Sequence, residues 1–349
     1  MNTKVVKINR IQPNPGAIYE AGNIIKSGGL VAFPTETVYG LGGDAFNPDS
    51  SRKIYEAKGR PSDNPLIVHI SNITDIDAVA TDIPAQAYEL AARFWPGPLT
   101  MILKKRPELP KETTGGLDTV AIRMPVNEVA LDLITASGGF IAAPSANRSG
   151  KPSPTQAQYV IEDMYGFVDM IIDGGDCDIG LESTIIDLTT KPVMILRPGF
   201  ITYETLKEII PDIVFDGAII DSDSDEPPRA PGMKYRHYAP KAEMTLVTGP
   251  VDNVISFIND RIAAKSAEGL KTGVIATDET HYLYNADSVK SLGSRKNEKQ
   301  IARNLFKVLR EFDDEEIDVI YAESFEEKGV FRATMNRMIK ASGNKEVRV

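Results

Sequence analysis

The chain has 349 residues, of which 42% are apolar and 25% are charged, and its formal net charge is −10. This length is past the size at which a single hydrophobic core usually divides, so we expect a soluble globular protein of two domains. The negative charge argues against a protein whose main partner is a nucleic acid, because such proteins usually present a basic face that releases counterions. The net charge does not exclude a local basic cleft.

The number of cysteines and the N-terminal segment indicate the cellular compartment in which we expect the protein. The one cysteine, Cys177, excludes an intramolecular disulfide and fits a reducing cytosol. The first residues contain no apolar core of a signal peptide, and no run approaches the roughly 20 apolar residues of a membrane-spanning helix. We therefore expect a cytoplasmic protein.

Helix-like and strand-like segments alternate through the first two hundred residues. Apolar spacing predicts a helix over 15–26 that ends at Gly28-Gly29, and Asn47-Pro48 marks the start of a helix that ends at Gly59. Further helices are predicted over 74–94, 127–137 and 155–165, and strands over 30–33, 66–70, 99–103, 120–125, 140–143, 170–172, 185–188 and 193–196. This interleaving indicates an α/β layer structure.

The composition changes after Pro211. Residues 216–241 have few apolar residues, are acidic and then proline-rich, and are predicted to be an interdomain linker. Beyond it, short strands over 244–247, 273–276, 289–292 and 319–322 are separated by helices around 254–264, 299–312 and 333–340. That pattern predicts a doubly wound α/β domain of about a hundred residues.

The stretch Phe33 to Gly42 follows an apolar strand and contains Thr35, Glu36 and Thr37 in a turn stiffened by Pro34. Their side chains cannot all enter a core, and the glycines let the backbone approach another group closely. We predict that this stretch is the floor of a small-molecule site.

The motifs of several enzyme classes are missing. The sequence has no P-loop and no Gly-x-Ser-x-Gly elbow, and Gly40-x-Gly42-x-x-Ala45 does not open a helix as a dinucleotide site requires. The three histidines and one cysteine have no metal-ligand spacing, so we expect no metal held by protein ligands alone.

Cations and hydroxyls gather instead at predicted strand and helix ends. Lys58 and Arg60 lie just past a helix, where an arginine fork suits phosphate oxygens, although a cation pair there could simply offset the helix macrodipole. The loop 143–155 runs into a helix N-terminus that could hold an anion or merely be capped by Thr155. Arg123, inside an apolar strand, must face an anion, which could be a ligand, Glu36 or Glu182.

These motifs resemble, in order, those of the YrdC-like threonylcarbamoyl-AMP synthases. The matching stretches are Phe33-Pro34-Thr35-Glu36-Thr37-Val38-Tyr39-Gly40-Leu41, Lys58-Gly59-Arg60-Pro61, Asn64-Pro65-Leu66, Trp95-Pro96-Gly97-Pro98-Leu99-Thr100, Arg123-Met124-Pro125, Pro144-Ser145-Ala146-Asn147, Glu182-Ser183-Thr184 and Arg197-Pro198-Gly199. Residues 231–240 are similar to the linker of the long, two-domain form of this enzyme. The C-terminal part matches mainly in position and length.

The resemblance implies a nucleotidyltransferase that makes threonylcarbamoyl-AMP and pyrophosphate from L-threonine, bicarbonate and ATP, with Mg²⁺ accompanying the ATP. The product would pass to separate tRNA threonylcarbamoyl-transferase proteins, and tight tRNA binding is not expected. Two alternatives stay open: a carbamoyltransferase that handles carbamoyl-adenylate, and a non-enzymatic RNA-binding module.

The resemblance also implies a fold and a set of site residues. We expect a YrdC-like mixed-sheet catalytic domain over 1–212, a linker over 213–242 that could fold over the active site, and a Rossmann-like domain over 243–349. The implied L-threonine ligands are Thr35, His69, Arg123 and Ser183, although a histidine alone in an apolar run, such as His69, is more often a core residue than a ligand. Lys58 and Arg60 are the implied catalytic cations, and the implied ATP ligands are Arg60, Asn64, Thr119, Ser145, Ser153, Arg197 and Tyr235.

Overall fold

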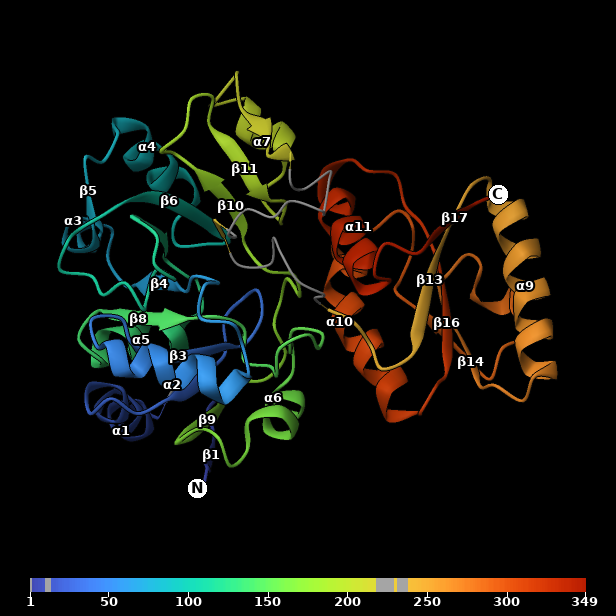
Figure 1. Cartoon of the computed structure of the whole chain (residues 1–349), viewed down its shortest axis with the longest axis horizontal. Helices are drawn as coiled ribbons and strands as arrows, with labels where there is room; N and C mark the ends of the chain where they lie inside the picture. Colours follow the sequence, from blue (N-terminus) through green and yellow to red (C-terminus); the bar gives the residue numbers. More distant parts are fainter. Residues whose placement is uncertain (1, 10–13, 218–228, 231–237) are drawn as a thin grey trace. The chain divides into compact units, whose positions relative to one another are not determined.

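The computed structural model describes all residues except 1, 10–13, 218–228 and 231–237 (Figure 1). The chain divides into two compact units. The N-terminal unit comprises Met1–Ser149, Ser153–Asp178 and Glu182–Lys234, and the C-terminal unit comprises Gly150–Pro152, Ile179–Leu181 and Tyr235–Val349.

Twelve strands of the described N-terminal unit form one mixed sheet. Their order is β1-β9-β2-β3-β8-β4-β7-β6-β10-β11-β12, and β5 pairs with β6. The strands are β1 (Lys4–Lys7), β2 (Val31–Phe33), β3 (Gly40–Asp44), β4 (Ile67–Ile70), β5 (Ala80–Thr81), β6 (Leu99–Lys105), β7 (Thr119–Arg123), β8 (Phe140–Ala143), β9 (Met170–Asp173), β10 (Thr184–Asp187), β11 (Met194–Arg197) and β12 (Val214–Phe215).

Helices cover both faces of this sheet. Because strand side chains alternate between faces, Val31 and Phe33 of β2 pack with α1 (Pro15–Lys26) and α5 (Glu128–Ala136), whereas Ala32 joins the core on the opposite face. That second core includes α2 (Pro48–Lys58), α4 (Ala85–Phe94) and α6 (Ala157–Met164). The shorter helix α7 is Tyr203–Lys207.

Three helix ends follow from local sequence. The Asn14 side chain accepts hydrogen bonds from the first N–H groups of α1, and Asn47 does the same for α2. Gly59 ends α2 in the left-handed conformation, with φ of 63°. The predicted limits of both helices are therefore explained by their caps.

The predicted helix over 74–94 is wrong. The structure contains the 3-10 turn η1 (Ile73–Asp75), the short helix α3 (Ile76–Val79), strand β5 and then α4. Asp82 has a φ of 52° and Pro84 directly precedes α4, and both residues are incompatible with a continuous helix. Of the two readings of the loop 143–155, capping by Thr155 does not hold, because α6 begins later, with Gln156 at its N-cap.

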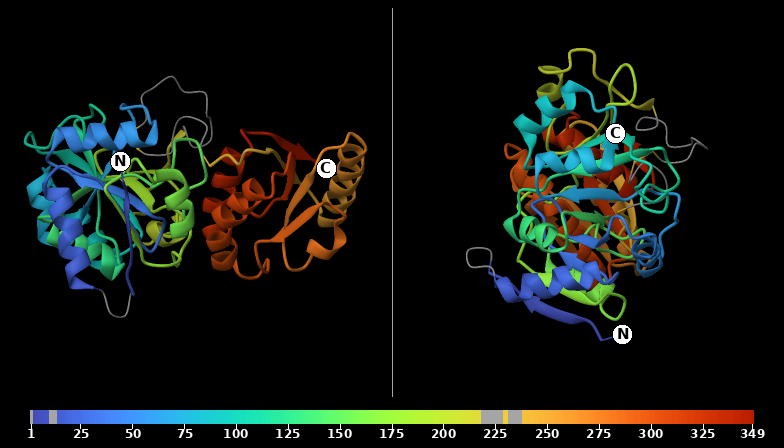
Figure 2. Two further views of the ribbon diagram at one scale, coloured as in Figure 1. Left: turned by 90° about the horizontal axis from the view of Figure 1, so that it is seen from below. Right: turned by 90° about the vertical axis from the view of Figure 1, so that its left-hand side faces the viewer.

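The C-terminal unit contains a parallel five-stranded sheet of order β15-β14-β16-β13-β17. Figures 1 and 2 show α9 on one side of this sheet and α10 and α11 on the other, which is the predicted doubly wound arrangement. The elements are β13 (Glu243–Thr248), α9 (Val251–Ala267), β14 (Thr272–Ala276), the 3-10 turn η2 (His281–Leu283), β15 (Ser288–Ser291), α10 (Glu298–Asp314), β16 (Val319–Glu323), α11 (Gly329–Ala341) and β17 (Glu346–Arg348).

Candidate functional site

The turn after β2 is fixed by the hydroxyl of Thr35. Its Oγ1 donates to the carbonyl of Val38 at 2.7 Å and accepts from the backbone N–H groups of Thr37 and Val38 at 3.1 and 3.3 Å. The Thr35 side chain is buried, so the turn has a single defined shape. This shape holds Glu36 and Thr37 toward the end of β7.

Arg123 at the end of β7 meets both of these residues. Its Nη2 forms an ion pair with Glu36 at 2.6 Å, and its Nη1 donates to Thr37 Oγ1 at 2.8 Å. The two charged side chains are 5% and 4% exposed, so the pair is almost dry. The sequence required an anion next to Arg123, and in the structure this anion is the carboxylate of Glu36.

His69 lies beside Arg123, because the two residues are register partners on the parallel strands β4 and β7. Its Nδ1 lies 3.0 Å from the carbonyl oxygen of Ile67. Burial, and then the neighbouring Arg123 charge, lower the pKa of His69 to about 3. The imidazole is therefore neutral at pH 7.

Lys58 closes α2 and points into the loop that follows β8. Its Nζ donates to the carbonyls of Ser145 and Asn147, at 2.5 Å each. The lysine is 2% exposed, so its charge is stabilised by backbone dipoles in a nearly water-free position. A cation held in this way suits an anionic ligand.

The loop between α2 and β4 contributes Arg60 and Asn64. The Arg60 guanidinium donates to the carbonyls of Asn64 and Pro65 at 3.2 to 3.4 Å. The Asn64 side chain is fully buried, and neither its amide nitrogen nor its amide oxygen has a partner within the described residues. A buried amide without partners costs about 1 to 3 kcal/mol, which a bound ligand could recover.

Ser183, Arg197 and Ser153 lie on neighbouring segments. Ser183 Oγ bonds Thr100 Oγ1 at 2.7 Å and accepts from Arg197 Nη2 at 3.1 Å. Ser153 donates to Glu182 at 2.6 Å, directly before Ser183 in the chain. Thr100 is the antiparallel register partner of Arg123, so these hydroxyls adjoin the Arg123 end of β7.

The turn after β2 joins the two groups of side chains. Leu41 N–H donates to Pro144 O at 2.9 Å, Ala146 N–H donates to Tyr39 O at 2.8 Å, and Gly40 bridges Ser145. The same turn therefore contacts Arg123 through Glu36 and Thr37 and adjoins the Lys58 loop. Residues far apart in the sequence converge on it.

One predicted ligand, Thr119, is not in this group. Thr119 begins β7, four residues before Arg123, and so lies about 13 Å along the strand from it. Tyr235 falls outside the described residues. Sequence reasoning gave no role to Thr37 and Asn147, which hold Arg123 and Lys58, and the only local signal for them was a polar residue two positions after Thr35 and Ser145.

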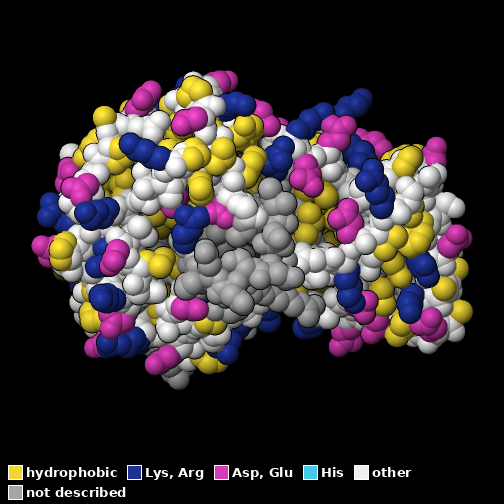
Figure 3. Space-filling view, turned by 45° about the horizontal axis from the view of Figure 1, so that its top comes forward, with side chains coloured by type: hydrophobic (Ala, Val, Ile, Leu, Met, Phe, Trp, Pro, Cys, Tyr) yellow, Lys and Arg dark blue, Asp and Glu magenta, His cyan; other side chains and the backbone are white. Residues whose placement is uncertain are grey.

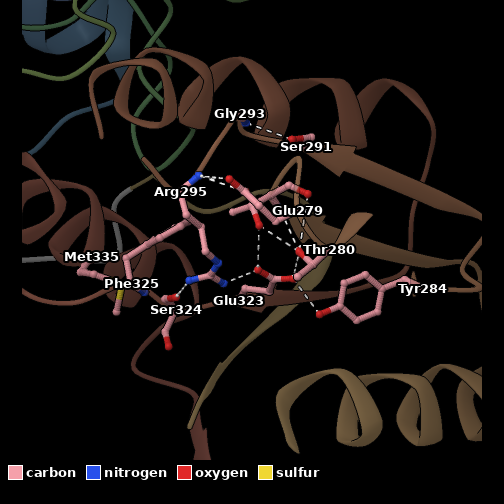
Figure 4. Close-up of polar contacts among 11 residues, drawn as sticks. Glu279, Thr280, Tyr284, Ser291, Gly293, Arg295, Glu323, Ser324, Phe325 and Met335 are labelled. Carbon is pink, nitrogen blue, oxygen red and sulfur yellow. Dashed lines mark hydrogen bonds and ion pairs between the residues drawn. The ribbon is translucent and has the colours of Figure 1, made fainter. Parts of the chain in front are cut away.

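A polar cluster also occupies the carboxyl ends of β14 and β16 in the C-terminal unit (Figure 4). Glu323 is 1% exposed, accepts from Tyr284 at 2.8 Å and from Thr280, and forms an ion pair with Arg295. Burial raises the pKa of Tyr284. The Glu323 carboxylate is thus fully surrounded by donors, and nothing in the sequence pattern identified it.

Other surface features do not locate a site. A cavity of about 960 Å³ is lined by parts of α1 and α2 and by Phe167 and Asp169, but by none of the predicted ligands. No helix in the described residues is long and apolar enough to cross a membrane, and these residues bring no three His, Cys, Asp or Glu side chains together as a metal site. Figure 3 shows acidic and basic side chains interspersed on one face.

Family models match nearly the whole chain. The Sua5/YciO/YrdC model, described as telomere recombination, matches residues 23–199, and the model of the threonylcarbamoyl-AMP synthase C-terminal domain matches residues 201–343. The threonylcarbamoyl-AMP synthase of Pyrococcus abyssi is 52% identical over 94% of this chain and 95% of its own length. That of Bacillus subtilis is 46% identical over 97% of both chains.

A solved structure agrees with these matches. The crystal structure of P. abyssi Sua5 complexed with L-threonine has a TM-score of 0.95 and 50% identity, covering 99% of this chain and all of the other. Both predicted domains, the mixed-sheet unit and the Rossmann-like unit, are thus accounted for. The chain belongs to the two-domain threonylcarbamoyl-AMP synthase family and is an enzyme of that family.

Proposed function

We propose that this enzyme joins L-threonine, bicarbonate and ATP into L-threonylcarbamoyl-AMP and releases pyrophosphate. The observation that carries the proposal is a set of three almost buried cations in one unit: Lys58, Arg123 and Arg197 are 2%, 4% and 6% exposed. Buried charges are costly unless they meet anions or other acceptors, and Arg123 forms an ion pair with Glu36. A carboxylate and a triphosphate are the anions that this substrate set brings.

In the proposed reaction, the amine of threonine and bicarbonate form a carbamate with loss of water. A carbamate oxygen then bonds the α-phosphorus of ATP, while the bond from that phosphorus to the bridging oxygen breaks and pyrophosphate leaves. Positioning and charge neutralisation contribute most to such transfers, so a dedicated acid or base is not required. We assign the substrate carboxylate to Arg123 and the charge between carbamate and phosphates to Lys58.

The ATP would be held by Arg60, Asn64, Ser145, Ser153 and Arg197, while Thr119 and Tyr235 stay predictions from the family resemblance. This set is made of cations and uncharged donors, which suit phosphate oxygens. Such donors fit Mg²⁺ only as a companion of the nucleotide, where it would neutralise phosphate charge. Thr35, His69 and Ser183 would complete the threonine pocket.

We place the enzyme in the cytoplasm, where its product would pass to tRNA threonylcarbamoyl-transferase proteins. The test is pyrophosphate release from ATP, measured with and without L-threonine and bicarbonate. We expect release only when all three substrates are present, with threonylcarbamoyl-AMP as the product. Release that is indifferent to threonine would overturn the proposal.

A further inference from the structure

The Glu36–Arg123 pair has an asymmetry that bears on substrate recognition. The two bonds of the guanidinium use its terminal nitrogens, Nη2 to Glu36 and Nη1 to Thr37. Its Nε is also buried but has no hydrogen-bond partner within the described residues. Arginine thus keeps an N–H that an incoming acceptor could use.

Glu36 is itself fixed from a second side. One carboxylate oxygen accepts from Arg123 at 2.6 Å, and the other accepts from the backbone N–H of Val126 at 3.3 Å. Thr37 is fixed through the hydroxyl of Thr35, at 2.9 Å. Both groups that hold the guanidinium are therefore themselves anchored to the backbone or to the turn.

The balance of charges gives a second reason to connect the Glu36–Arg123 pair with substrate recognition. A buried arginine needs a counter-charge to be stable without substrate, and Glu36 supplies it. A guanidinium plane held by two bonds also keeps its remaining N–H groups in fixed directions within one plane, which favours a planar carboxylate as ligand. An arginine side chain without these two bonds would lose more conformational entropy each time it bound a carboxylate.

We propose that Glu36 is the positioning residue of the amino-acid subsite: it aims Arg123 so that the free Nε–H meets the carboxylate of the substrate amino acid. This inference rests on the proposed function, because it takes an α-amino acid as the ligand. Glu36 touches Arg123 and not the reacting atoms. Its effect is on carboxylate recognition and not on the phosphate side of the site.

The experiment measures binding of L-threonine and of L-threonine amide, which lacks the negative carboxylate, to the full chain by calorimetry. The unmodified protein should bind threonine better than the amide. In Glu36→Gln, threonine binding should weaken at least about tenfold while amide binding changes much less, so that the preference collapses. ATP binding should be unchanged.

Two further variants keep the test sharp. Thr37→Val removes the second tether of Arg123 and should also reduce the preference for threonine over the amide, even if Glu36→Gln folds poorly. Asp187→Asn weakens another buried carboxylate–arginine pair, with Arg229 at 3.2 Å, and should leave the preference intact.

A folded Glu36→Gln or Thr37→Val protein that keeps the full preference overturns the positioning role. Loss of the preference in Asp187→Asn as well would show a general stability effect and would also overturn it. If the unmodified protein binds no L-threonine, the proposed function fails first. The two failures are thus distinguishable.

Discussion

His69 and Arg123 face each other from adjacent parallel strands, one neutral and one charged, in the same nearly dry position. Burial, and then the charge of Arg123, keep the imidazole unprotonated and lower the pKa of His69 to about 3. The imidazole can therefore offer an uncharged polar edge beside the guanidinium. A second cation would compete with Arg123 for the carboxylate.

This arrangement predicts a pH dependence of stability. The unfolded chain binds a proton at His69 below pH about 6.5, whereas the folded chain does not until pH about 3, so the free energy of unfolding falls as the pH drops through this window. The contribution is up to about 1.4 kcal/mol per pH unit. We expect His69→Asn to reduce the slope between pH 4 and 6, measured by denaturant titration of the N-terminal unit's transition.

The exposed His281 provides the control for that experiment. His281→Asn should leave the slope unchanged. An unaltered slope in His69→Asn would mean that His69 titrates normally in the folded protein.

A substitution of Asn64 should change ATP affinity without lowering the stability of the protein. Because neither amide atom of Asn64 has a partner among the residues that the structure describes, Asn64→Leu removes no hydrogen bond seen there, and the thermal stability of the variant should be equal or higher. ATP affinity should fall about tenfold, the usual loss of one or two hydrogen bonds to a charged group. Asn147→Leu is the contrast, because Asn147 is bonded and its loss should destabilise the fold. Unchanged ATP affinity in Asn64→Leu would remove Asn64 from the site.

Arg60→Ala should lose roughly 2 to 4 kcal/mol of transition-state stabilisation, which is about what deletion of one preorganised donor costs. The measurement is kcat/KM for pyrophosphate release. Arg52 on α2 pairs with Asp49 and Glu112 at the surface, so Arg52→Ala should remain near the unmodified rate. Near-normal kinetics of Arg60→Ala would exclude it from catalysis.

Glu323→Leu should destabilise the C-terminal unit by several kcal/mol. The substitution removes a buried carboxylate and leaves Arg295 and the hydroxyl of Tyr284 without their acceptor. Glu326→Leu changes an exposed residue whose ion pair is with Lys328, also at the surface, and should have little effect. Thermal unfolding of the two proteins gives the comparison, and equal transitions would contradict the structural role of Glu323.

Features that depend only on residues close together in the sequence could be predicted from local patterns. The caps of α1 and α2 and the need of Arg123 for an anion are examples, since each follows from a few residues and the cost of burying charge. The choice between Glu36 and Glu182 could not be predicted, because it depends on how β7 lies against the turn after β2.

Strand β3 was not predicted for a similar reason. Its residues Gly-Leu-Gly-Gly-Asp have low strand propensity, and the strand exists because β2 and β8 pair with it. A Cβ at Gly42 would lie 2.7 Å from Ile141, so glycine is required for close packing there. Likewise the Lys58 contacts span 87 and 89 residues of sequence, beyond the reach of any local pattern.

The strand order of the N-terminal unit has a consequence for how the chain is made. β1 pairs with β9, β2 also pairs with β9, and β6 pairs with β10. During synthesis, β1 therefore cannot complete its pairing until residue 173 has been made, and the site cannot form until Arg197 has been made. At roughly 5 to 20 residues per second this delay lasts about 10 to 40 s, during which β1 lacks its partner and β2 and β6 each lack one of their neighbours.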